Sequence, residues 1–215
     1  MKKFLGVLII NLFIINSCLG DDIRDIQIEG ISIGDNAIDF FSEDLLKKST
    51  SKISGTDNKF SFAAIYDKRF GEYINISNFN FETFDAVEVY FLSSDKNYKI
   101  YALSGALTKN IGKKFKTEKE CIKKKEKIYL DIKPIFKNAE AVNDSSWAPL
   151  DKAKKSKFYR TFLRLTPNSK YYEVEVSCIF YKGEISKTYE SNVGITLMSD
   201  EFNDWKSKQK LFNQQ

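Results

Sequence analysis

Two pairs of hydrophobic segments constrain the fold most strongly, because a short polar stretch separates the members of each pair. Residues 86–92 and 98–103 flank five polar residues, and residues 158–165 and 171–181 flank another five. Apolar and polar side chains alternate along these segments, which is typical of strands with one covered face and one wetter face. Segments of this kind that are joined by five-residue loops predict antiparallel hairpins.

Shorter patterns predict the remaining strands and loops. Short runs with β-branched or aromatic residues predict four more strands, over residues 25–29, 60–66, 73–76 and 193–197. Small polar residues dominate the stretches 49–58 and 143–155, which therefore predict loops.

The longest helix is predicted over residues 117–136, where apolar side chains recur at helical spacing and Cys121 lies on the buried stripe. Thr117 and Glu120 fit the spacing of a capping box. Shorter helices are predicted over residues 32–41, 42–48 and 200–208. The sequence thus predicts an α+β protein, with an antiparallel sheet built from hairpins, one long amphipathic helix packed on it, and short flanking helices.

Residues 1–20 have the layout of a secretory signal peptide. Lys2 and Lys3 precede an apolar run that is too short to span a bilayer, and small residues follow it. The rest of the chain, residues 21–215, is expected to form a single α+β domain, with two similar halves at about 21–110 and 111–215 as an alternative. The protein is therefore expected to be exported, to the periplasm or the outer membrane of a Gram-negative bacterium.

Cys18 leaves two routes of processing open. Cleavage after Gly20 would discard this cysteine, whereas residues 15–18 loosely match a lipobox that would make Cys18 a lipidated N-terminus. A lipid on Cys18 would be the protein's one expected attachment to a membrane.

Cys121 and Cys178 remain after either route, and an even pair in an oxidising compartment predicts a disulfide. The alternative is two separately buried thiols. A bond between them would close a long loop and stabilise the fold by about 4 kcal/mol in the chain-entropy treatment.

The absence of histidine is the strongest chemical constraint. It excludes Ser-His-Asp triads, Cys-His dyads, histidine zinc sites and histidine pH sensing. The chain also has no glycine-rich phosphate loop, no G-x-S-x-G elbow and no cysteines at metal-ligand spacing. We therefore predict no catalytic, cofactor-binding or metal-binding residues, and no cofactor.

The charge pattern argues against nucleic acid as a partner. The net charge is +5 and only four residues are arginine, the side chain best suited to phosphate and base recognition. A lysine-rich run over residues 113–127 is interrupted by glutamates and predicts a solvated helix face, with contact to an anionic membrane surface or an acidic partner as the alternative. Aromatic residues gather over 66–84 and predict core packing, with an exposed apolar patch as the alternative.

Three stretches resemble a family of exported proteins of marine alphaproteobacteria of the Pelagibacter type. These are the helix around Cys121 and the sequences Ile28-Glu29-Gly30-Ile31-Ser32-Ile33-Gly34-Asp35 with Asp39-Phe40-Phe41-Ser42, and Glu201-Phe202-Asn203-Asp204-Trp205. That family has no assigned activity, so the resemblance implies export and fold only. Over residues 30–41 the chain is also similar to BamE-like outer-membrane assembly lipoproteins and the related beta-lactamase-inhibitor fold.

These observations favour an exported, non-enzymatic binding or envelope-structural module that acts through a sheet face or an aromatic patch. Its partner would be an envelope protein or a ligand; the sequence does not identify it or predict an oligomeric state. The alternative is a histidine-free hydrolase that uses carboxylates and lysines, for example on glycans. An enzyme would require a deep pocket with two converging carboxylates, or a buried lysine beside an acid.

Overall fold

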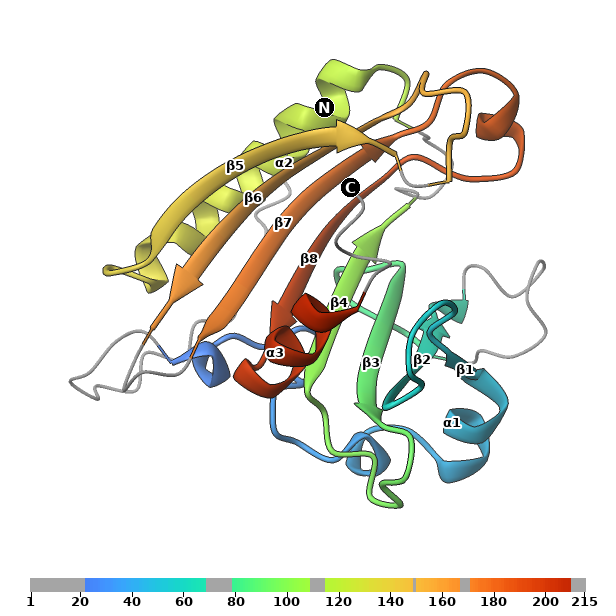
Figure 1. Cartoon of the computed structure of the whole chain (residues 1–215), viewed down its shortest axis with the longest axis vertical. Helices are drawn as coiled ribbons and strands as arrows, with labels where there is room; N and C mark the ends of the chain where they lie inside the picture. Colours follow the sequence, from blue (N-terminus) through green and yellow to red (C-terminus); the bar gives the residue numbers. More distant parts are fainter. Residues whose placement is uncertain (1–21, 69–78, 109–114, 149, 167–170, 210–215) are drawn as a thin grey trace, which may run out of the picture.

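One eight-stranded antiparallel sheet organises the molecule (Figure 1). The computed structural model describes residues 22–68, 79–108, 115–148, 150–166 and 171–209. The strand order is β1-β2-β3-β4-β8-β7-β6-β5. The strands are β1 (Thr50–Lys52), β2 (Phe60–Tyr66), β3 (Ala86–Leu92), β4 (Ala102–Leu107), β5 (Glu140–Trp147), β6 (Lys157–Leu165), β7 (Tyr172–Phe180) and β8 (Asn192–Met198).

Two four-stranded meanders meet at the centre of this sheet. The first runs from β1 to β4 and follows helix α1 (Glu43–Ser49), and the second runs from β5 to β8 and follows helix α2 (Glu118–Ile132). Strands β4 and β8 join them, with Ala102 opposite Met198 and Leu107 opposite Val193.

The face of the sheet that packs against α2 contains most of the hydrophobic core. Alternate residues Val174, Val176 and Cys178 of β7 are fully buried there, as their spacing predicts. Helix α2 contacts β7 and β8 and lies behind them in Figure 1. Cys121 of α2 is bonded to Cys178, with the sulfur atoms 2.05 Å apart, so the structure agrees with the predicted disulfide.

The opposite face is covered at one end by helix α3 (Asp200–Lys208), which lies in front of the strands in Figure 1. Phe202 and Trp205 of α3 are buried against Phe60, Ala102 and Met198, as expected for a helix that packs these two aromatic residues.

Side-chain caps begin the three α-helices, including the one that the capping-box spacing predicts at Thr117. The hydroxyl groups of Ser42, Thr117 and Ser199 each accept a hydrogen bond from the backbone N–H three residues ahead. Helix α2 ends at Ile132, earlier than predicted, and a 3-10 turn over Lys133–Ile135 accommodates Pro134.

The predicted strand over residues 25–29 is wrong. Ile23–Asp25 forms a 3-10 turn, and Ile28 pairs with Ile31 across a tight turn at Glu29 and Gly30, both with positive φ. The Glu29 carboxylate accepts hydrogen bonds from the backbone N–H groups of residues 82, 83 and 84, at 2.8 Å each. These bonds fix the turn to the segment that precedes β3. The helix predicted over residues 32–41 is reduced to a 3-10 turn at Ala37–Asp39.

The second strand of the first hairpin begins four residues later than predicted, at Ala102. Backbone groups of residues 98–100 bond instead with residues 34–37, so they are not available to β3. The Asp95 carboxylate also accepts the N–H groups of Asn97 and Lys99, which stabilises a longer connection.

The loop predicted over residues 143–155 is wrong in its first part, because β5 extends through Trp147. Strand β5 is the edge of the sheet and is exposed on both faces for most of its length, so its sequence lacks the alternation of a half-buried strand.

Several predictions concern residues outside the described part of the chain. These are the signal peptide, Cys18, the strand over 73–76, and the first lysines of the run over 113–127. Within the described ranges, no helix combines the length and the apolar character needed to cross a bilayer.

Candidate functional site

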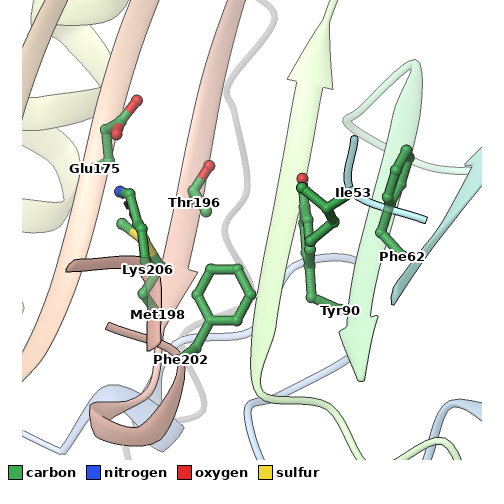
Figure 2. Close-up of a pocket in the computed structure, with 8 residues that line it drawn as sticks. All are labelled: Ile53, Phe62, Tyr90, Glu175, Thr196, Met198, Phe202 and Lys206. Atoms are coloured by element: carbon green, nitrogen blue, oxygen red, sulfur yellow. Dashed lines mark hydrogen bonds between the residues drawn. The ribbon is translucent and has the colours of Figure 1, made fainter. Parts of the chain in front are cut away.

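A pocket of about 250 Å³ lies on the α3 face of the sheet (Figure 2). It crosses from β2 to β7 and is bounded at one side by α3. Its lining residues are Ile53, Phe62, Tyr90, Glu175, Thr196, Met198, Phe202 and Lys206. Apolar walls with a few polar groups are typical of small-molecule sites. The volume lies below their usual range of about 300–1,000 Å³, so only a very small ligand would fit.

The register of the sheet brings four polar side chains into one row beside this pocket. Glu88 lies opposite Ser104, Ser104 opposite Thr196, and Thr196 opposite Glu175, on adjacent strands β3, β4, β8 and β7. The hydroxyl groups of Ser104 and Thr196 are hydrogen-bonded at 3.1 Å. A polar row therefore crosses this face of the sheet, with a carboxyl group at each end.

Glu175 is the unusual member of the row. It is only 9% exposed, and its carboxyl group accepts no hydrogen bond and forms no ion pair with any described residue. Burial raises its pKa, against the opposing effect of Lys206 and Arg160. Figure 2 shows this carboxyl beside the amino group of Lys206 at one end of the pocket.

The basic side chains near Glu175 are engaged with other acids. Arg160 of β6 pairs with Asp144 of β5. Arg164 and Lys206 lie 3.5 Å and 3.9 Å from the carboxylate of Glu173, which is two residues before Glu175 on β7. The three basic side chains thus face three acids, Asp144, Glu173 and Glu175, and Lys206 and Arg160 also act electrostatically on Glu175.

Glu88 at the other end of the row is half-buried, and it has a hydrogen-bond donor. The hydroxyl of Tyr90 donates to its Oε2 atom at 2.7 Å. Burial raises the pKa of Glu88, and the hydrogen bond from Tyr90 opposes that rise. Burial also raises the pKa of the Tyr90 phenol well above its usual value, so this hydroxyl keeps its proton.

Packed aromatic rings fix the α3 side of the pocket. The ring of Phe202 lies 5.2 Å from Phe60 and 5.3 Å from Tyr90, and Trp205 lies 5.0 Å from Phe60. Side chains held in this way cannot swing out to change the pocket's floor without breaking several contacts. The walls are therefore preformed.

The disulfide and the aromatic stretch that the sequence predicts do not line this pocket. Cys121 and Cys178 are on the opposite face of the sheet, where the bond ties α2 to β7. Of the aromatic residues over 66–84, Phe79 and Phe81 pack in the core near Phe41, which agrees with core packing for this part of the stretch.

The lysine-rich run differs from its prediction at one residue. Lys125 is 4% exposed, and its amino group reaches the exposed carboxylate of Glu126 at 2.7 Å. The Lys125 side chain is therefore covered over nearly its whole length, and its charge is paired with a carboxylate that reaches solvent.

The sequence contained only part of the signal for the pocket. The alternation over residues 172–178 places Glu173 and Glu175 on the face opposite Val174. The alternation of β3 likewise places Glu88 and Tyr90 on the face opposite Val87 and Val89. Nothing local indicates that β4 pairs with β8, and this pairing is what brings Glu88 and Glu175 into one row.

No family model, curated protein or solved structure matches this chain. The two resemblances seen in the sequence therefore stay predictions. Among the residues that the structure describes, no three acidic or cysteine side chains are grouped so as to hold a metal ion.

Proposed function

We propose that this chain is an exported, non-enzymatic binding protein that holds a small ligand in the pocket on the α3 face of its sheet. One observation carries the proposal. The pocket has rigid apolar walls and, at one end, the buried Glu175 carboxyl, which has no hydrogen-bond donor among the described residues. A preformed apolar pocket with a few polar groups is the usual form of a small-molecule site.

The geometry gives less support to a hydrolase. Three strand spacings of about 4.8 Å separate Glu88 from Glu175, so their backbones lie roughly 14 Å apart. Paired carboxylates of glycoside hydrolases lie about 5 to 9.5 Å apart. Glu175 is the single carboxyl-bearing residue that lines the pocket. The buried Lys125 beside Glu126 is on α2, behind the sheet.

In this proposal α2 acts as the long amphipathic support on the other face of the sheet. The disulfide fixes α2 to β7, the strand that carries Glu175. Export to an oxidising compartment would keep that bond formed.

Fluorescence of Trp205 offers a direct test, since this residue packs 5.3 Å from Phe202 at the pocket wall. The variant Trp147→Phe would leave Trp205 as the single tryptophan reporter. We expect compounds from a chemically diverse set of small molecules to change its emission and to raise the melting temperature.

A matched pair of variants locates the binding site. Phe62 lines the pocket, whereas Phe158 is a half-buried phenylalanine on the same face of β6, outside the lining. Phe62→Ala should weaken binding of any ligand found, and Phe158→Ala should not. If no compound in the set binds, or if both variants bind it equally, the proposed function is wrong.

A further inference from the structure

Three segments that are distant in sequence meet at one end of the sheet: the start of α2, the connection between β5 and β6, and the connection between β7 and β8 (Figure 1). The hydroxyl of Ser156 accepts the backbone N–H of Lys182 at 3.0 Å, and the amino group of Lys182 donates to Glu118 of α2 at 2.6 Å. The segments therefore form one continuous surface, the basic end, made of residues 115–120, 150–157 and 182–190.

The exposed charge at the basic end is mostly positive. It contains eight lysines and five acids, but seven of the lysines are exposed and only two of the acids, Glu120 and Glu184, are. The buried carboxylate of Asp151 accepts three backbone N–H groups of its own connection, and Glu118 accepts hydrogen bonds from Lys182 and Tyr159. The exposed lysines are Lys116, Lys119, Lys152, Lys154, Lys155, Lys182 and Lys187.

Exposed apolar side chains gather at the same end. Among the described residues five large hydrophobic side chains are exposed, and three of them are Trp147, Leu150 and Tyr189. Trp147 ends β5 beside the basic end, with the amino group of Lys157 at 3.6 Å from its ring centre. The ring of Tyr189 lies 5.7 Å from that of Tyr181, which supports it at the surface.

We propose that the basic end docks on a bilayer surface that carries anionic phospholipids. Lysines next to such a surface are attracted by its negative potential. Tryptophan and tyrosine favour the interface between headgroups and hydrocarbon, and an exposed leucine gains by entering it. The lysine-rich run of α2 thus acts through its first residues, where a second group of lysines joins it. This contact would add to any lipid on Cys18.

The kind of basic side chain favours lipid over a partner of fixed shape. No arginine occurs at the basic end, although arginine is the side chain that holds carboxylates and phosphates in a defined two-point geometry. Lysine is a flexible, strongly hydrated point charge, which suits headgroups that move laterally. An acidic protein is the competing partner, and the experiment below distinguishes it.

Sedimentation with vesicles tests the proposal on the disulfide-bonded protein. Every protein in the test carries Cys18→Ser, so that no lipid is attached to it. We expect binding to phosphatidylcholine vesicles with about one third phosphatidylserine, and at least about tenfold weaker binding to pure phosphatidylcholine. Added salt should weaken the first interaction, because it screens exposed charges.

Two triple variants with the same net charge locate the contact. The variant with Lys152, Lys154 and Lys155 changed to Gln should bind the anionic vesicles at least about tenfold more weakly than wild type. The control changes to Gln three exposed lysines of the first meander and its preceding helix, and it should bind like wild type. These are Lys48, Lys52 and Lys96.

Two exposed leucines form the second matched pair. Leu150 at the basic end is 52% exposed, and Leu130 near the other end of α2 is 62% exposed. Leu150→Ala should weaken vesicle binding by at least about threefold, because it removes apolar surface that enters the interface. Leu130→Ala should leave it unchanged.

The outcomes decide between lipid, an acidic protein and neither. Absence of binding to the anionic vesicles, equal binding to both vesicle types, or equal losses in the two triple variants overturns the proposal. Equally tight binding to soluble poly-glutamate, with no effect of Leu150→Ala, assigns an acidic protein and also overturns it. None of the residues that line the pocket belongs to the basic end, so these results leave the proposed ligand binding untouched.

Discussion

The indole N–H of Trp205 donates a hydrogen bond of 2.7 Å to Oδ1 of Asp57, which joins α3 to the loop before β2. The side chain of Gln209 adds two contacts to Asp57 from the end of the same helix. The floor of the pocket therefore depends on one surface carboxylate that receives donors from the far end of the chain.

Replacing this carboxylate should loosen α3. We expect Asp57→Ala to lower the melting temperature and to shift the emission of Trp205 to longer wavelength, because the indole loses its acceptor. The hydrogen bond from Trp205 lowers the pKa of Asp57 below its usual value of about 3.9. This contribution to stability is complete above that value and is lost as the pH falls through the lower pKa of the folded state.

Melting curves between about pH 2 and pH 6 would check the Asp57 prediction. The difference between wild type and Asp57→Ala should shrink at the acid end. Asp204→Ala provides the control, because Asp204 is an exposed acid on the outer side of α3. A difference that is constant over this range would contradict the proposed role of the carboxylate.

Glu175→Gln should stabilise the free protein at pH 8. Burial raises the pKa of Glu175 in the folded state, so folding favours its neutral form. The group's contribution is complete below the unfolded pKa of about 4.3 and is lost as the pH rises through the raised folded pKa. Each unit between these two values changes the free energy of unfolding by about 1.4 kcal/mol.

Denaturant unfolding at pH 4 and pH 8 would measure this effect. We expect the variant to gain stability relative to wild type only at the higher pH, while Glu140→Gln, which alters an exposed acid on β5, gains none at either. The charged groups that influence Glu175 are Lys206, Arg160, Glu173 and Asp144. Because the ion pairs among these groups also contribute to stability, the variant is compared with wild type at each pH. Equal loss of stability by Glu175→Gln at both pH values would contradict the prediction.

Gly105→Ala should destabilise the protein by about 1–3 kcal/mol. A Cβ atom at this position of β4 would come within 2.8 Å of the Phe84 ring, which packs over the strand. Gly194 on the adjacent β8 is the control, since its new Cβ atom would meet its nearest neighbour at 3.4 Å. Denaturant unfolding of both variants would give the comparison, and equal losses would show that the Phe84 contact is not the cause.

Loss of the disulfide should cost about 4 kcal/mol, because it closes a long loop between α2 and β7. The double variant Cys121→Ala, Cys178→Ala should unfold at lower denaturant concentration than wild type. Reduction of wild type should produce a similar loss, whereas the variant should be unaffected by reductant. Two reactive thiols in the unfolded, unreduced wild-type protein would show that the bond is absent.

Strong local patterns predicted much of the secondary structure. The patterns of residues 60–66 and 86–92 predicted the bounds of β2 and β3, and the Thr117 capping box predicted the start of α2. Strand β5 was missed because an exposed edge strand has no buried face to impose alternation. The displaced start of β4 depends on backbone bonds from residues 34–37, which lie far away in the sequence.

The pocket was less predictable than the strands. The orientation of Glu175 follows from the pattern of β7, but its charged neighbours Arg160 and Lys206 come from β6 and α3. Only the assembled sheet determines which of these charges meet.

The central pairing of β4 with β8 has a consequence for how the chain folds. Neighbouring strands within each meander are close in sequence, whereas the paired residues of β4 and β8 are roughly 90 residues apart. Local pairings close small loops and form early, so we expect the two meanders to form first and their junction last. Phe62 and Tyr90 belong to one meander and Thr196 and Glu175 to the other. The pocket is therefore completed only in the final step of folding, and a bound ligand would slow the separation of the two halves.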